Sequence, residues 1–135
     1  VNALYSLGIG LAKFVPLNTQ LEAGKNVILE IEIQGARKIK EQYPDAVLLF
    51  VTTNDAQTLK DRLTGRGTES EEVIRNRLLR AAQEAEGADE YDYILVNDDL
   101  ETCVREMHEL IQAQRHKTSQ NQEFIVEMKE DLKQF

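Results

Sequence analysis

Residues 27–51 read Val-Ile-Leu-Glu-Ile-Glu-Ile-Gln-Gly-Ala-Arg-Lys-Ile-Lys-Glu-Gln-Tyr-Pro-Asp-Ala-Val-Leu-Leu-Phe-Val. The first seven residues are β-branched and largely apolar, which predicts a buried strand over 27–33. Helical composition follows over 36–42, and the proline of the Tyr-Pro pair at 43–44 ends it. The unbroken apolar run over 46–51 is typical of a parallel strand that is covered on both faces. The order strand, helix, strand therefore predicts how the fold begins.

The same alternation continues toward the C-terminus. The further predicted elements are a helix over 54–65, a helix ending near 86, a strand over 93–96 and a helix over 100–113. Asn54 is the expected N-cap of the first helix, and Gly65 is expected to end it in the left-handed conformation. Thr68 and Glu71 have the spacing of a capping box for the second helix. Alternating strands and helices predict an α/β fold with a parallel sheet and flanking helices.

The chain divides into three parts. We assign no structure to residues 1–23, place the α/β core at 24–113 with a mobile lid at about 62–77, and expect a C-terminal helix within 114–135. That helix carries an apolar stripe at helical spacing, which predicts that it docks on the core. The stripe consists of Phe124, Ile125, Met128 and Leu132.

Composition narrows the classes of partner. The 135 residues carry 24 acidic and 16 basic side chains, for a net charge of -8, and this field repels a nucleic-acid backbone. The apolar opening has no basic residue before it and is too short to span a bilayer, so we expect neither a signal peptide nor a membrane span. Cys103 is the sole cysteine, which fits a reducing cytoplasm.

Three arginines surround a short glycine-flanked loop. Arg62 lies near the end of one predicted helix, Arg66 lies between two glycines, and Arg77 lies on the next helix. If the loop folds over a bound phosphate, their guanidinium groups can converge on it and neutralise charge that builds up during transfer. The alternative is a solvated basic face that pairs with nearby glutamates.

Two carboxylates stand in a strand that otherwise reads as buried. Glu30 and Glu32 would share one strand face, where an unpaired charge is costly and demands a partner. A substrate or a metal-bound water is one partner, and a strand-edge salt bridge is an equally good alternative. His108 and His116 have no partner at metal-ligand spacing, so we predict no protein-bound metal.

The glycine and lysine at 24–25 do not form the usual phosphate-binding loop. Gly24-Lys25 has Thr19 in place of the first glycine of G-x-x-x-x-G-K-[ST], and Asn26 follows the lysine. We therefore expect Gly24 to be a turn glycine.

Taken together, several segments closely resemble guanylate kinase in order and spacing. They are the Gly-Lys-Asn-Val-Ile-Leu-Glu-Ile-Glu-Ile-Gln-Gly-Ala run at 24–36, the Arg-Leu-Thr-Gly-Arg-Gly-Thr run at 62–68, Arg77-Leu78, the Glu-Tyr-Asp-Tyr run at 90–93 and the Val-Asn-Asp-Asp-Leu run at 96–100. The resemblance implies an incomplete fold of the P-loop nucleoside monophosphate kinase type. It also implies that the complete enzyme transfers the γ-phosphoryl group of ATP to GMP with Mg²⁺.

The resemblance also implies roles for individual residues. Arg62, Arg66 and Arg77 match lid and phosphate-clamp arginines, Glu32 matches a carboxylate that contacts GMP, and Asn97 matches a residue beside the adenine. The family usually has Asp at the position of Glu32. The amino-terminal P-loop and most of the GMP-binding segment are missing, so we expect negligible activity from this chain alone. One alternative hypothesis is a catalytically dead guanylate kinase-like interaction module. Another is a truncated gene product, whose unpaired strand edge would favour a homodimer.

Overall fold

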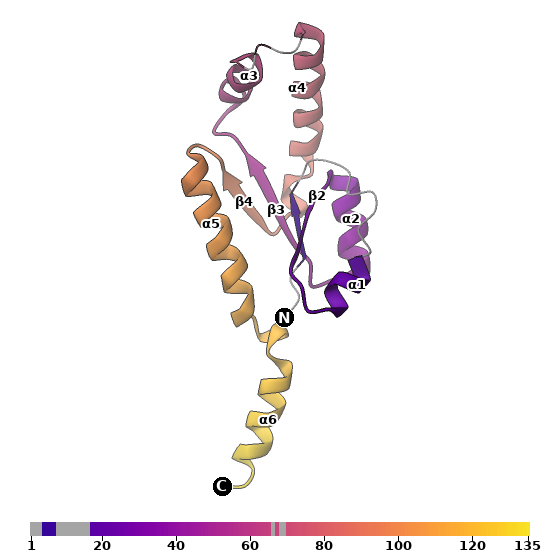
Figure 1. The fold of residues 1–135 in the computed structure, drawn as a ribbon, viewed down its shortest axis with the longest axis vertical. Helices are drawn as coiled ribbons and strands as arrows, with labels where there is room; N and C mark the ends of the chain where they lie inside the picture. Colours follow the sequence, from indigo (N-terminus) through magenta and orange to yellow (C-terminus); the bar gives the residue numbers. More distant parts are fainter. Residues whose placement is uncertain (1–3, 8–16, 66, 68–69) are drawn as a thin grey trace.

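A parallel sheet forms the centre of the protein. The computed structural model describes residues 4–7, 17–65, 67 and 70–135. The sheet has the strand order β2-β1-β3-β4 (Figure 1). Its strands are β1 (Leu4–Leu7), β2 (Val27–Glu30), β3 (Val47–Thr52) and β4 (Tyr93–Val96). All pairs are parallel, so the predicted α/β fold with a parallel sheet is confirmed.

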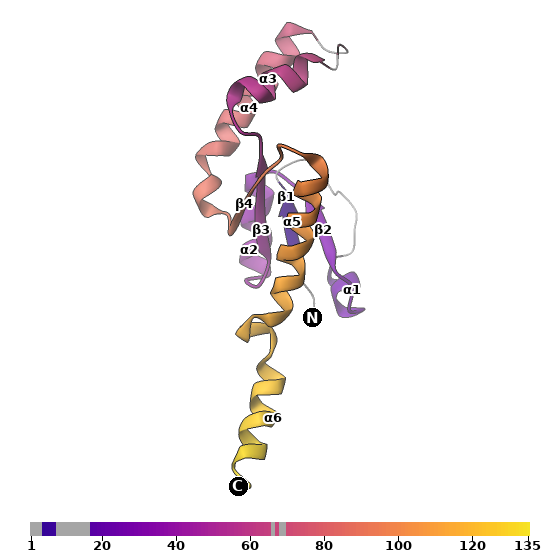
Figure 2. The same ribbon diagram turned by 90° about the vertical axis from the view of Figure 1, so that its left-hand side faces the viewer.

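Helices connect and flank the strands. They are α1 (Leu17–Glu22), α2 (Ile33–Gln42), α3 (Ala56–Gly65), α4 (Glu71–Glu86), α5 (Leu100–Ala113) and α6 (Gln122–Leu132), with short 3₁₀ turns η1 (Ala88–Glu90), η2 (Gln114–His116) and η3 (Thr118–Gln120). The predicted helix over 100–113 and the predicted end near residue 86 are confirmed. Helices α3 and α4 together form an arm that extends beyond the sheet (Figures 1 and 2).

Strand β1 was not predicted. It lies between β2 and β3, where Tyr5 is paired with Ile28 on one side and with Val47 on the other. Four residues are too few to give a convincing strand pattern by themselves, and only the pairing with two neighbours defines them. The unassigned opening of the chain therefore contributes an interior strand of the sheet.

Each face of the sheet has its own apolar cluster. On one face α5 packs against β3 and β4 through Cys103 and Met107, and Leu49 beneath them is fully buried. On the other face α2 packs through Ile39 against Leu29. Side chains alternate across a strand, and Val47, Leu48 and Leu49 of β3 are all buried, as the sequence predicts for a strand covered on both faces.

The junction between β2 and α2 differs from the prediction. The strand ends at Glu30, and α2 already begins at Ile33 with Glu32 as its N-cap residue. Glu30 and Glu32 therefore do not share a strand face, because Glu32 has left the sheet. The apolar pattern failed here because Ile31 packs against the α2 cluster from beyond the end of the strand, and Ile33 is half-buried in the first turn of a helix.

The caps of the arm helices also differ. Asp55, and not Asn54, caps α3, since its carboxylate accepts a hydrogen bond from the Thr58 amide at 2.7 Å. The positive φ of 64° belongs to Gly67 and not to Gly65. Ser70 is the N-cap of α4 and accepts from the Val73 amide, whereas Thr68, the predicted capping residue, lies outside the described residues.

Two helices bury none of their described residues. In α4 none of the described residues is buried, and Ile94 on the neighbouring strand β4 is 59% exposed. The prediction that the C-terminal helix docks on the core is wrong, because α6 extends away from the sheet and Phe124 is 63% exposed (Figures 1 and 2). A stripe predicts a helix and its apolar side, but it contains no information on whether a partner surface lies within reach.

Within the described ranges, none of the helices is long and apolar enough to cross a membrane.

Candidate functional site

The carboxyl ends of the strands meet below the arm. In parallel sheets ligands bind outside these ends, at the point where the strand order reverses. Here the chain passes from β1 to β2 on one side and then to β3 on the other, so the reversal lies between β1 and β3. Three described segments border it: 30–33 after β2, 52–55 after β3 and 97–99 after β4. We define the candidate site as this edge of the sheet.

Arg62 connects the arm to the loop after β4. Its two terminal nitrogens donate to the backbone oxygens of Asn97, at 2.7 Å, and Asp98, at 3.1 Å. The structure therefore brings together two residues, Arg62 and Asn97, that only a resemblance had linked. Because both bonds end on main-chain carbonyl groups, the side chain of Asn97 is not used in this contact.

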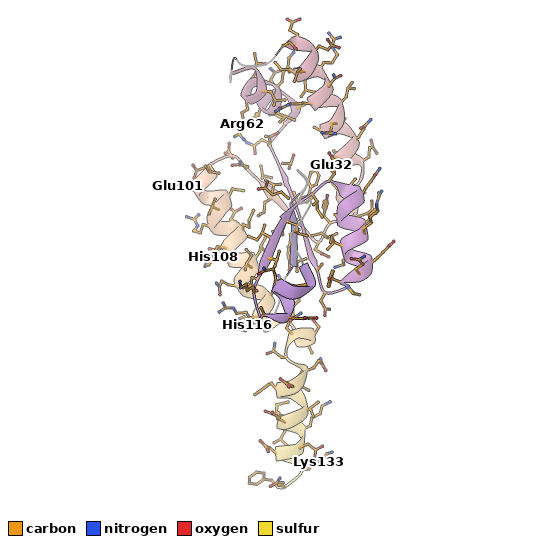
Figure 3. All side chains as sticks on the ribbon, turned by 45° about the vertical axis from the view of Figure 1, so that its right-hand side comes forward. Glu32, Arg62, Glu101, His108, His116 and Lys133 are labelled. Carbon is orange, nitrogen blue, oxygen red and sulfur yellow. The ribbon has the colours of Figure 1, made fainter. Side chains whose placement is uncertain are left out.

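Glu32 lies at the other edge of the same end of the sheet. With a strand spacing of about 4.8 Å, the ends of β2 and β4 are roughly 14 Å apart, a distance that a bound nucleotide can span. Figure 3 labels Glu32 near the start of α2 and Arg62 below α3. The Glu32 carboxylate pairs with Arg80 of α4, with 3.3 Å between Nη2 and Oε1.

Two aspartates organise the loops of the site. Asp99 caps α5, accepting from the hydroxyl and the amide of Thr102, and these two bonds hold the pKa of its carboxyl below the usual range. Asp55 caps α3, and the bond from the Thr58 amide lowers the pKa of that carboxyl in the same way. Both carboxylates therefore serve helix starts.

The other predicted residues have separate places. Arg77 is exposed on α4, and Glu30 is exposed at the end of β2. Arg66 lies outside the described residues. His108 and His116 are exposed, and Figure 3 shows them on α5 and just after it, away from Glu32 and Arg62.

Gly24 is a turn glycine, as expected. It adopts a φ of 79° between α1 and β2, and its amide donates to the carbonyl of Leu21. This turn precedes β2, so it lies at the amino end of the sheet, away from the candidate site.

Arg80 and Glu84 are the residues that sequence reasoning missed. Arg80 pairs with Glu32, and Glu84 accepts a hydrogen bond from the Ile33 amide at 3.0 Å across 51 residues of chain. Their four-residue spacing places them on one face of α4, but that pattern is common on exposed helices. Only the tertiary structure shows which residues this face meets.

The described residues contain no group of three or more His, Cys, Asp or Glu side chains that could hold a metal ion.

Comparison with known proteins gives a consistent family. Residues 14–114 match the family model for guanylate kinase, a match that begins ahead of α1 and includes the arm and the three strands β2, β3 and β4. A guanylate kinase of Lactococcus lactis subsp. lactis is 43% identical over 117 residues, which cover 87% of this chain and 57% of that protein. One from Lactobacillus delbrueckii subsp. bulgaricus is 41% identical over 114 residues, or 84% of this chain and 53% of that protein.

A solved structure has the same fold. The guanylate kinase from Anaplasma phagocytophilum superposes with a TM-score of 0.52 at 18% identity, covering 89% of this chain and 88% of that chain. At this identity the likeness concerns the fold alone. The chain spans about half the length of the curated relatives it matches.

Proposed function

The chain belongs to the guanylate kinase family, and on this premise we propose that the complete protein transfers the γ-phosphoryl group of ATP to GMP. In this reaction an oxygen of the GMP phosphate forms a bond to the γ-phosphorus. The bond from that phosphorus to the bridging oxygen breaks, and the electron pair leaves with ADP. The products are ADP and GDP.

Glu32 is the proposed contact to the guanine base. An ionised carboxylate only accepts hydrogen bonds, and guanine offers two adjacent donors, the N1–H and the 2-amino group. Glu32 lies at the carboxyl end of β2 with 45% of its side chain exposed, so part of the carboxylate is accessible to a ligand. Adenine presents an acceptor at N1, which an ionised Glu32 does not satisfy.

The ATP side of the proposed site lies at the end of β4. Arg62 fixes the loop that carries Asn97, and Asn97 is the proposed neighbour of the adenine. Arg62, Arg66 and Arg77 are the proposed phosphate contacts, and Arg66 and Arg77 would close over the nucleotide with the arm. Transfer depends on this positioning and on neutralised charge, since the protein contributes no covalent step.

Magnesium is proposed to arrive with ATP. It would neutralise phosphate charge during transfer.

For this chain alone we propose binding without appreciable turnover. None of its 135 residues forms a G-x-x-x-x-G-K-[ST] motif, and the glycine and lysine nearest to that pattern lie at the wrong end of the sheet. Losing one transition-state arginine costs on the order of 10³–10⁵ in rate in related enzymes, so losing the phosphate cradle should cost at least as much.

One observation supports this function best. Arg62 and the Asn97 loop lie on one side of the point where the strand order reverses, and Glu32 lies on the other side. Calorimetric titration of the purified chain tests it. We expect saturable binding of GMP that weakens about tenfold or more in Glu32→Gln, since hydrogen bonds to a charged group contribute about 1.5–3 kcal/mol. Equal affinity for GMP and CMP would contradict the proposal.

A coupled assay of ADP formation tests the second part. With ATP and GMP present, we expect turnover by the chain to stay at the background rate. Robust formation of GDP by the purified chain would show that the transfer site is complete, against our proposal.

A further inference from the structure

The start of α2 is capped from another helix. The first amides of a helix have no acceptor within it, and a polar residue at the N-cap usually supplies one. At α2 the N-cap residue is Glu32, and its side chain makes no capping hydrogen bond. Instead the Ile33 amide donates to Oε2 of Glu84 at 3.0 Å. A carboxylate in this position is also favoured by the helix dipole.

The Glu32 carboxylate takes no part in capping its own helix. Glu84 satisfies the first amide of α2, which belongs to the residue directly after Glu32 and so holds the backbone at this point. Arg80, one turn earlier on α4, pairs with Oε1 of Glu32 at 3.3 Å. One oxygen of Glu32 is thus paired with a guanidinium group, and the other has no capping bond to make. The same helix face therefore both holds the backbone beside this carboxylate and orients it.

Close packing explains how α4 reaches the start of α2. Gly87 is buried at the end of α4, and a Cβ atom built on it would lie 1.7 Å from Cδ1 of Ile33. Residues 80, 84 and 87 follow the i, i+4, i+7 spacing of one helix face. A pair between Arg37 of α2 and Glu90 of η1 joins α2 to the segment after α4, and its hydrogen bonds keep the pKa of Glu90 below the usual range.

We propose that Arg80 and Glu84 are positioning residues that present Glu32 to the base of the bound monophosphate. The inference rests on the proposed function, because it takes Glu32 as the residue that contacts the base. Glu84 holds the backbone at 32–33, and Arg80 sets the direction of the carboxylate. The two residues act through Glu32 and do not touch the nucleotide.

Base selection follows from this arrangement. A carboxylate that is held in one orientation can accept from the guanine N1–H and 2-amino group together, whereas a freely rotating one loses part of this pairing. Inosine monophosphate retains the N1–H and lacks the 2-amino group. The orientation set by Arg80 should therefore matter more for GMP than for inosine monophosphate.

The first test needs no nucleotide. We expect Glu84→Ala to speed hydrogen exchange of the Ile33 amide by about tenfold or more, because that amide loses its only described acceptor. Glu86 is an exposed glutamate of the same helix, so Glu86→Ala serves as the matched control and should leave this exchange unchanged. Unchanged exchange in Glu84→Ala, with helix content intact, would overturn the capping part of the proposal.

The second test measures base selection with the purified chain. We expect Arg80→Gln to weaken GMP binding about tenfold and inosine monophosphate binding by a smaller factor. In a Glu32→Gln background the same change should have no effect on either ligand, because Arg80 acts only through Glu32. Arg75 is an exposed arginine on the same helix, so Arg75→Gln is the charge-matched control and should leave both affinities unchanged.

The outcomes separate the two proposals. An equal loss of affinity for both nucleotides, or a loss that persists without the Glu32 carboxylate, would show a general structural role for Arg80 and overturn the inference. If the unaltered chain binds no GMP, the proposed function fails for this chain and with it the base-selecting role. The exchange of the Ile33 amide would then still show whether α4 holds the α2 start.

Discussion

The sheet face under α5 and the carboxyl end of the same sheet are built in opposite ways. The face is apolar and closed, with Leu49 fully buried and Cys103 4% exposed. The carboxyl end is polar and open, and its contacts join residues far apart in the chain, such as Arg62 with Asn97 and Arg80 with Glu32. The first region carries the stability of the fold, and we propose that the second carries its binding chemistry.

The largest expected effect is on the buried face. Leu49→Ala should lower the free energy of unfolding by about 3 kcal/mol, since it removes a leucine side chain from a closed core and leaves a cavity. Urea denaturation followed by circular dichroism measures this change. A loss below about 1 kcal/mol would mean that the β3 core is not closed as described.

The opposite pattern is expected at the carboxyl end. Arg62→Ala should weaken ATP binding about tenfold, because the loop carrying Asn97 loses two hydrogen bonds, while Tm changes by less than about 2 °C, as is usual for an exposed side chain. Calorimetric titration and thermal melting measure the two quantities. Arg62→Lys retains the charge but cannot bridge both carbonyl groups, and it should recover only part of the affinity. A large decrease in Tm without a loss of ATP affinity would show that Arg62 serves the stability of the fold and not ATP binding.

A smaller effect, dependent on pH, is expected at the α5 cap. The pKa of Asp99 is lowered in the folded state by its bonds from Thr102, so its stabilising contribution is complete above the unfolded pKa of about 3.9 and is lost as the pH falls through the folded value. Asp99→Ala should lower Tm by about 3–5 °C at pH 7. The difference from the unaltered chain should shrink below about pH 4, and a difference that grows on acidification would contradict this account.

The smallest effect is expected on α6. Phe124→Ser should change Tm by less than about 1 °C, because this side chain is 63% exposed on a helix that extends away from the sheet. Met107→Ser on α5, which enters the core cluster, should lower Tm several times more. Equal losses in the two variants would show that α6 packs on the body in solution.

The helices α5 and α6 also show how far sequence reasoning reaches. Both have amphipathic patterns, and both were predicted as helices. Cys103 packs on the sheet while Phe124 stays exposed, because docking depends on where the helix lies and not on its own pattern. The strand β1 was missed for a related reason, since four residues become a strand only through their neighbours in the sheet.

The candidate site could be predicted in part. Arg62, Asn97 and Glu32 were identified from the resemblance, and the structure places all three at the carboxyl end of the sheet. Arg80 and Glu84 could not be found in this way, since their contacts with Glu32 and Ile33 span about fifty residues and follow from how α4 meets α2. No local sequence pattern specifies how α4 packs against α2.

Chemical-shift mapping of bound nucleotide tests the central claim most directly. On titration of the ¹⁵N-labelled chain with GMP and then ATP, the account predicts saturable shifts of the Ile33 amide with GMP and of the Asn97 and Asp98 amides with ATP. Saturable shifts confined to α6 or to the amino ends of the strands would contradict the placement of the nucleotide site.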